Sequence, residues 1–267
     1  MARSLVACLA LCSLFACGDS SDDGTADTGT TGDTSSEDVA SEDAADARGD
    51  SGEDAAPAGP VTVRILVRKI APDNPLIVGA DVCVVTHPEI ACGVTDDEGY
   101  VTFEVPGQAN LAFSVVAEGF PSTILMLASG AEDEELNLNI GSAEYLDLEE
   151  LLIHEAIDLQ TRGLINVNAR GARGVYDQDV AGVEYALEPA GSGPFYLTVG
   201  GPDLTLTATT DEGSADFVNL EPGTYHLTAS GDGLTCTPWL GWEGEGDATM
   251  DVLVQPGFIT QCSVVCE

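Results

Sequence analysis

Two segments of the sequence repeat the same order of strand and turn signals, and this internal repeat limits the possible folds more than any other feature. The copies span residues 75–120 and 179–234. Each opens on an apolar strand with adjacent Gly and Ala, followed by a Thr-Asp turn closed by Gly, an aromatic residue, a Pro-Gly turn and a last alternating strand. Asp and Gly build hairpin turns and Pro-Gly reverses the chain. Each copy therefore predicts a unit of short strands, with an insertion at 188–202 in the second.

Apolar and polar residues alternate along these segments, as expected for strands with one buried face. At the start of the first sheet region the buried face is predicted to hold Val61, Val63, Ile65 and Val67. The same period appears at 101–105 and 225–230. Further strands are expected at 80–86, 111–117, 136–140, 164–169, 180–187, 204–209, 247–254 and 259–265. Short strands at this spacing predict an all-β fold of two antiparallel sandwiches rather than a parallel α/β sheet.

One segment, 146–159, has a helical period instead. Its apolar residues are expected to form one face: Leu148, Leu151, Leu152, Ile153, Ala156 and Leu159. Asp147 and Glu150 are spaced as in a capping box, and Gly163 is expected to end the helix. We therefore expect one short amphipathic helix between the two sheet regions.

The N-terminus carries an export signal. Arg3 precedes an apolar run, 5–16, which has the length of a secretory core and is too short to span a bilayer. The run closes on Leu14-Phe15-Ala16-Cys17, which resembles the lipobox of bacterial lipoproteins. This resemblance implies cleavage before Cys17 and its modification with palmitate-type acyl chains, which together hold a protein firmly at a membrane. The alternatives are an ordinary signal peptide with a chance cysteine, or a poor membrane helix.

These signals divide the chain into five parts. A signal peptide, 1–16, is followed by the lipidated cysteine and an acidic linker, 17–58, which has no aromatic residue and is expected to be disordered. The first sandwich is expected at 59–141, the linking helix at 142–162 and the second sandwich at 163–267. The linker is rich in Asp and Gly but does not match the ligand spacing of an EF-hand.

The formal net charge of −38 excludes a general nucleic-acid binder, because such proteins need a basic patch. Lys69 is the only lysine in the chain. A surface this acidic resists self-association. The sequence alone leaves open whether the acidic surface also binds cations.

The repeat resembles the carboxypeptidase regulatory-like domain, a transthyretin-like sandwich similar to collagen-adhesin B repeats and to starch-binding-like folds. In the first copy the resemblance lies in PLIVGADVCVV and TDDEGYVTFEVPGQANLAFSVVAEGF. In the second copy it lies in DVAGVEYAL and TTDEGSADFVNLEPGTYHLTASGDGL. The resemblance implies a non-catalytic accessory or surface module. The adhesin repeats often contain a Lys–Asn isopeptide bond, for which Lys69 with Asn137 or Asn139 would be the partners. Because Val115 occupies the position of the assisting acid, we expect no such bond and an exposed lysine.

Five cysteines remain after export and lipidation: Cys83, Cys92, Cys236, Cys262 and Cys266. A hairpin turning at 87–88 places Cys83 opposite Cys92, and an oxidising compartment would join them. Cys262 and Cys266 lie about 13 Å apart along one strand, so only one of them can reach Cys236. Resemblance to other tandem-sandwich lipoproteins favours Cys236–Cys266, which leaves Cys262 as a buried free thiol.

Catalytic motifs are missing from the sequence. It has no Gly-x-Ser-x-Gly, no His-Glu-x-x-His and no phosphate-binding glycine loop. The histidines are scattered singly, so we expect no metal and no cofactor. Trp239 and Trp242 form a candidate ligand platform for a sugar, although such residues more often close the end of a sandwich.

The expected function is therefore that of a non-catalytic envelope lipoprotein with a structural or interaction role, anchored in a Gram-negative-type membrane. Gly18 after the cysteine resembles outer-membrane sorting in enteric bacteria. The expected partners are the membrane and an envelope protein or glycan. Two alternatives stay open: a carbohydrate- or peptide-binding surface module, and an unrecognised hydrolase.

Overall fold

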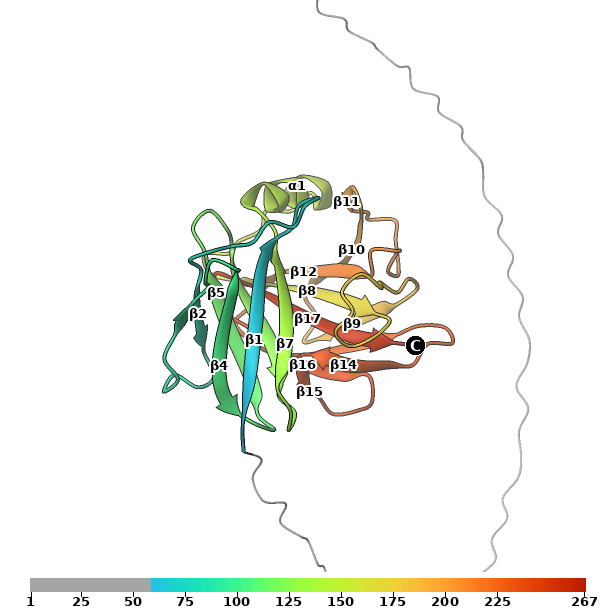
Figure 1. Ribbon diagram of the computed structural model, residues 1–267. Coiled ribbons are helices and arrows are strands. Elements are labelled where there is room, and N and C mark those ends of the chain that lie inside the picture. The colour runs from blue at the N-terminus through green and yellow to red at the C-terminus, as the bar shows by residue number, and fades with distance from the viewer. Residues whose placement is uncertain (1–58) are drawn as a thin grey trace, which may run out of the picture. The chain divides into compact units, whose positions relative to one another are not determined.

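The computed structural model describes residues 59–267, which form three β-sheets and one helix (Figure 1). The first sheet has the order β4-β1-β7 and the third the order β15-β16-β13-β9. Between them lies a ten-stranded sheet with the order β11-β10-β12-β8-β17-β6-β5-β2-β3, in which β14 also pairs with β17. The all-β prediction is thus confirmed.

The strands of the first sheet are β1 (Pro60–Lys69), β4 (Tyr100–Pro106) and β7 (Glu134–Ile140). Those of the central sheet are β2 (Asp81–Val84), β3 (Gly93–Val94), β5 (Asn110–Val116), β6 (Ser122–Ala128), β8 (Gly163–Arg170), β10 (Ser192–Thr198), β11 (Gly201–Pro202), β12 (Ser214–Leu220), β14 (Cys236–Leu240) and β17 (Phe258–Cys266). The third sheet holds β9 (Glu184–Glu188), β13 (Gly223–Ser230), β15 (Trp242–Glu243) and β16 (Thr249–Val254).

The central sheet buries both of its faces. Leu111 and Phe113 of β5 pack with the first sheet, whereas Ala112 between them packs into the core that the third sheet closes. On β6, Leu125 packs with the first sheet and Met126 packs into the core that the third sheet closes. The predicted alternation is confirmed in the outer sheets, where Val61, Val63, Ile65 and Val67 are buried.

The two halves of the chain share this central sheet, because β6 pairs in parallel with β17. The described residues belong to one compact unit. Parallel pairs also join β1 to β7 and β17 to β8, so the sandwiches are not purely antiparallel as the sequence had suggested. The predicted domain boundaries at 141/142 and 162/163 stay a prediction.

The repeat has the same hydrogen bonds in both copies. Thr95 is buried, and its hydroxyl accepts from the Ala80 amide at 2.9 Å and donates to the Ile77 carbonyl at 2.8 Å. Thr209 does the same with the Val183 amide at 2.9 Å and the Val180 carbonyl at 2.8 Å. The structural match to Thr95 is therefore Thr209, one residue before the threonine that the sequence motif selects.

Both expected disulfides are present. Asp81 pairs with Val94 and Val82 with Gly93, and this register brings Cys83 opposite Cys92, to which it is bonded. Cys236 of β14 lies opposite Cys266 of β17 and is bonded to it. Cys262 is a buried free thiol, and burial raises its pKa well above the ordinary value.

Several expected strands need correction. Residues 204–209 form a loop, in which Asp203 accepts hydrogen bonds from the amide and hydroxyl of Thr205. The strand expected from residue 180 begins only at Glu184. Seven strands were not predicted from the sequence: β3, β6, β10, β11, β12, β14 and β15. In β6 both faces are buried, so no alternation marks this strand.

The helix α1 (Ala143–Ile153) begins three residues before the predicted start and ends earlier than expected, since His154 adopts the left-handed conformation. The predicted capping box is absent, and Glu150 instead accepts a hydrogen bond from the Ile157 amide after the helix. Gly163 begins β8 and does not end the helix. The buried face holds Glu149 and Ile153, whereas Leu148 and Leu151 are exposed.

Candidate functional site

A cavity of about 380 Å³ lies between α1 and the central sheet. The helix contributes Tyr145, Leu146 and Glu149 to its lining, while β8, β12 and β17 form its floor. The first sheet borders it through Ile70 and Gly141, which directly follow β1 and β7 (Figure 1, where α1 lies at the top of the view). We call this space the α1 cavity.

Polar side chains cross the floor of the α1 cavity in a row. Strand register places Asp216 of β12 opposite Asn166 of β8, and Asn166 opposite Gln261 of β17. Neighbouring residues on paired strands point to the same face of a sheet. The residues between them, such as Ile165 and Val167, point to the opposite face and into the core.

Hydrogen bonds fix this polar row. The amide of Asn166 donates to Asp216 Oδ1 at 2.6 Å and its oxygen accepts from Asn168 at 3.0 Å. Asn168 Oδ1 in turn accepts from the Ser214 hydroxyl at 2.6 Å and from Arg170 at 3.2 Å. The guanidinium of Arg170 is paired with Asp179. The side-chain oxygens of both asparagines thus already accept hydrogen bonds, while the carboxyl of Asp216 points to the cavity side.

Glu149 faces this row from the helix. Its side chain is only 1% exposed, and neither carboxylate oxygen has a hydrogen-bond donor among residues 59–267. Burying an unpaired carboxylate is costly. Burial, followed by the charge of Asp216, raises the pKa of Glu149 to about 10, so this group keeps its proton at neutral pH.

Asp216 is the ionised member of this carboxyl pair. Burial raises its pKa to about 6, and the hydrogen bond from Asn166 opposes that rise. Two carboxyl groups that share a site cannot easily both ionise. At neutral pH the pair therefore holds one proton and one negative charge at the floor of the cavity.

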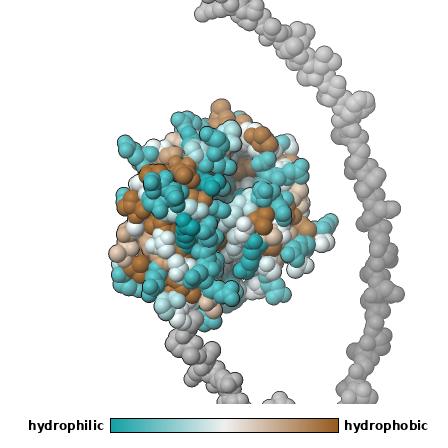
Figure 2. Space-filling view, in the orientation of Figure 1, coloured by the Kyte–Doolittle hydropathy of each residue, from teal (hydrophilic) through white to brown (hydrophobic). Residues whose placement is uncertain are grey.

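Exposed apolar side chains line part of the mouth of the α1 cavity, and the exposed Glu212 also belongs to the lining. Ile70 is 54% exposed and Val199, between β10 and β11, is 92% exposed, and both line the opening. Leu146, Leu197 and Ile259 continue the apolar wall inward. On the face seen in Figure 2, apolar side chains lie in small groups among polar ones.

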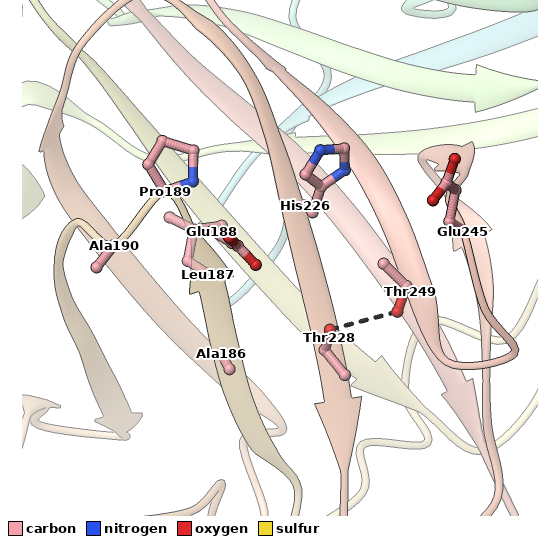
Figure 3. Close-up of a pocket in the computed structure, with 9 residues that line it drawn as sticks. All are labelled: Ala186, Leu187, Glu188, Pro189, Ala190, His226, Thr228, Glu245 and Thr249. Atoms are coloured by element: carbon pink, nitrogen blue, oxygen red, sulfur yellow. Dashed lines mark hydrogen bonds between the residues drawn. The ribbon is translucent and has the colours of Figure 1, made fainter.

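A second, more open hollow of about 690 Å³ lies over the third sheet (Figure 3). His226 of β13 is exposed, and its Nδ1 lies 2.6 Å from Asp251 Oδ1. Thr228 and Thr249 hydrogen-bond to each other at 3.3 Å across the same strands. This hollow has no buried polar group among its lining residues, so the α1 cavity is the stronger candidate site.

The structure does not support the tryptophan platform. Trp239 is 6% exposed and packs against Tyr176, with 5.2 Å between ring centroids. Trp242 is partly buried, and its indole N–H donates to the Leu111 carbonyl at 3.0 Å. The rings close the junction between the sheets and present no shared exposed face to a sugar.

Lys69 is half-buried rather than exposed, and the parallel register of β1 and β7 places it opposite Ile140. Asn137 lies opposite Leu66 and Asn139 opposite Arg68. Neither asparagine is therefore the direct cross-strand neighbour of the lysine.

Cys17, the predicted lipidation site, lies outside the described residues. Within 59–267, no helix has the length and apolarity needed to cross a membrane, and no group of three or more His, Cys, Asp or Glu residues has an arrangement that could hold a metal ion.

The residues of the α1 cavity were not predicted from the sequence. One local signal was available: Glu149 interrupts the buried stripe that Tyr145 and Ile153 define on either side of it, at helical spacing. Asn166 and Asn168 similarly alternate with the apolar residues of β8. Their meeting with Asp216 depends on pairing between distant strands, which no local pattern shows.

No family model and no curated protein matches this sequence. Solved structures give weak matches. The minor pilin GBS52 of Streptococcus agalactiae is 14% identical, with 77% of this chain and 95% of that chain covered and a TM-score of 0.26. The shaft pilin SpaA of Lactobacillus rhamnosus GG is 10% identical over 78% of this chain and 98% of that chain, with a TM-score of 0.23.

The Bacillus anthracis TIE protein is 12% identical, with a TM-score of 0.24; the match covers 78% of this chain and only 34% of that protein. Scores this low carry no functional argument. The fold assignment therefore depends on the strand pairing described above.

Proposed function

We propose that this protein is a lipid-anchored, non-catalytic component of a bacterial cell envelope with a structural or interaction role. The observation that carries the proposal is the pair of disulfides, Cys83–Cys92 and Cys236–Cys266. Disulfides form and persist in oxidising compartments. They agree with the export signal and with the lipobox-like ending at Cys17.

The duplicated unit supports a structural or interaction role. Thr95 and Thr209 hold equivalent turns with equivalent hydrogen bonds, as expected if one sandwich unit occurs twice. This pattern supports the resemblance to carboxypeptidase regulatory-like modules, whose role is accessory. The acidic segment 17–58 would then hold the sandwiches away from the membrane surface.

The anchor is tested with Cys17→Ser, and Cys12→Ser is the matched control because Cys12 leaves with the signal peptide. The proposal expects Cys17→Ser to leave the detergent phase of a Triton X-114 partition and to lose incorporation of an alkyne-labelled palmitate. Cys12→Ser should behave as the wild type. Unchanged partition and labelling of Cys17→Ser would contradict the anchor.

A second candidate function is that of a binding module. The α1 cavity favours it, because its volume falls within the roughly 300–1,000 Å³ of small-molecule sites and buried polar groups converge in it. An interaction role and a ligand site are compatible in one envelope protein.

A further inference from the structure

The α1 cavity combines features that point to one class of ligand. None of the side chains that line it, all within residues 59–267, is basic, whereas Glu149, Asp216 and Glu212 are acidic. The nearest guanidinium in the floor network, that of Arg170, is paired with Asp179. An anionic ligand would find no counter-charge among the lining residues.

The buried carboxyl pair shows where a charged group would bind. Glu149 has no hydrogen-bond donor in the described part of the chain, and the side chain of Asp216 receives one from Asn166. A buried polar group without a partner costs stability unless something supplies the missing contact. Donors that bring positive charge would satisfy both carboxyls at once.

A calcium ion fits this geometry poorly. Calcium takes about 6–8 oxygen ligands. The oxygens of Asn166 and Asn168 already accept hydrogen bonds from neighbouring side chains. The carboxyl pair alone is too small a ligand set, and no metal-type cluster of acids is found within 59–267.

We propose that the α1 cavity binds a small organic cation, a primary ammonium on an apolar chain. The ammonium donates to the carboxyl groups of Asp216 and Glu149 at the floor. The apolar chain packs along Leu146, Leu197 and Ile259 toward the mouth at Ile70 and Val199. This site is additional to the structural role proposed above and does not depend on the lipid anchor.

The proposal is tested by isothermal titration of the protein from Gly59 onward with 1-hexylamine, in buffered 150 mM salt at pH 7. Residues 59–267 belong to one compact unit, and circular dichroism and a melting curve establish that the fragment is folded before titration. Salt is needed because this fragment, with 33 Asp and Glu against 6 Lys and Arg and a net charge of −27, attracts any cation weakly over its surface. The expected result is saturable binding of one hexylamine per protein.

Variants separate the site from the surface. Asp216→Asn should weaken hexylamine binding by about tenfold or more, because the charge-assisted hydrogen bond to the ionised, buried carboxylate is lost. Glu144→Gln is the matched control: it removes an exposed carboxylate from the same helix and should change the affinity less than about twofold. Melting curves identify any variant that fails to fold.

Two further probes test the chemical class. 1-Hexanol has the same apolar chain without the charge, and calcium chloride supplies charge without the chain. The proposal would be overturned if hexanol bound as tightly as hexylamine. It would also be overturned if hexylamine did not bind and calcium did, with Asp216→Asn abolishing the calcium binding. So would the absence of saturable binding by hexylamine, or equal loss of affinity in Glu144→Gln.

Backbone amide NMR gives an independent readout. Hexylamine should shift resonances of Asn166, Asp216 and Gln261 in the floor of the α1 cavity and leave those of His226 and Thr249 in the second hollow unchanged. Shifts confined to exposed acidic segments would show surface binding only and would overturn the site.

Discussion

Glu149→Gln should make the free energy of unfolding less dependent on pH. Burial raises the pKa of Glu149 to about 10 in the folded protein, whereas an unfolded glutamate has a pKa near 4.5. Between these values the folded state holds a proton that the unfolded state has released. The stability that Glu149 contributes is therefore complete below about pH 4.5 and is lost as the pH rises toward 10.

The magnitude follows from this linkage. One such proton lowers the free energy of unfolding by about 1.4 kcal/mol for each pH unit. The pKa of Asp216, raised to about 6, adds a slope of the same sign only below pH 6. Between pH 6 and pH 8 the pH dependence of stability therefore reflects Glu149. Over this range the free energy of unfolding of the wild type should fall by up to about 3 kcal/mol.

Urea unfolding of the fragment from Gly59 onward, followed by tryptophan fluorescence at pH 6, 7 and 8, measures this difference. The glutamine side chain does not titrate in this pH range. The stability of Glu149→Gln should therefore fall less steeply than that of the wild type. Glu144→Gln should keep the wild-type slope. Parallel pH profiles for wild type and Glu149→Gln would refute the assignment of a raised pKa.

Two other predictions concern what holds the sheets together. Thr95→Val and Thr209→Val should each lower the free energy of unfolding by about 1–3 kcal/mol, because each leaves a buried amide and carbonyl without the hydroxyl; equal stability of the valine variants in urea would show that these bonds are unimportant. Replacing Cys236 and Cys266 together by alanine should lower stability by about 3–4 kcal/mol, since the bridge closes a loop of sequence separation 30; a melting temperature unchanged from that of the oxidised wild type would contradict this.

Local patterns predicted the parts of the fold that depend on neighbouring residues. The buried faces of β1, β4 and β13 follow from a period of two, and the Cys83–Cys92 pair follows from a hairpin register that a few residues determine. In β6 the same reasoning failed because a strand in a middle layer is apolar on both faces. The alternation at 204–209 predicted a strand where the chain forms a loop.

The α1 cavity shows why the site was harder to predict than the fold. Glu149, Asn166 and Asp216 come from segments that are distant in sequence, and only the pairing of β8 with β12 under α1 brings them together. The tryptophans, in contrast, stood out in the sequence, yet Trp239 packs inside the protein. The two tryptophans were therefore a poorer indicator of the candidate site than Glu149, a single acidic residue in the apolar face of the helix.

Mass spectrometry of the mature N-terminus gives the sharpest test of a lipid-anchored envelope protein. The first residue should be Cys17, with a mass increased by thioether-linked diacylglycerol and an amide-linked acyl chain. An N-terminal peptide that begins at any other residue, or that contains an unmodified Cys17, would contradict it.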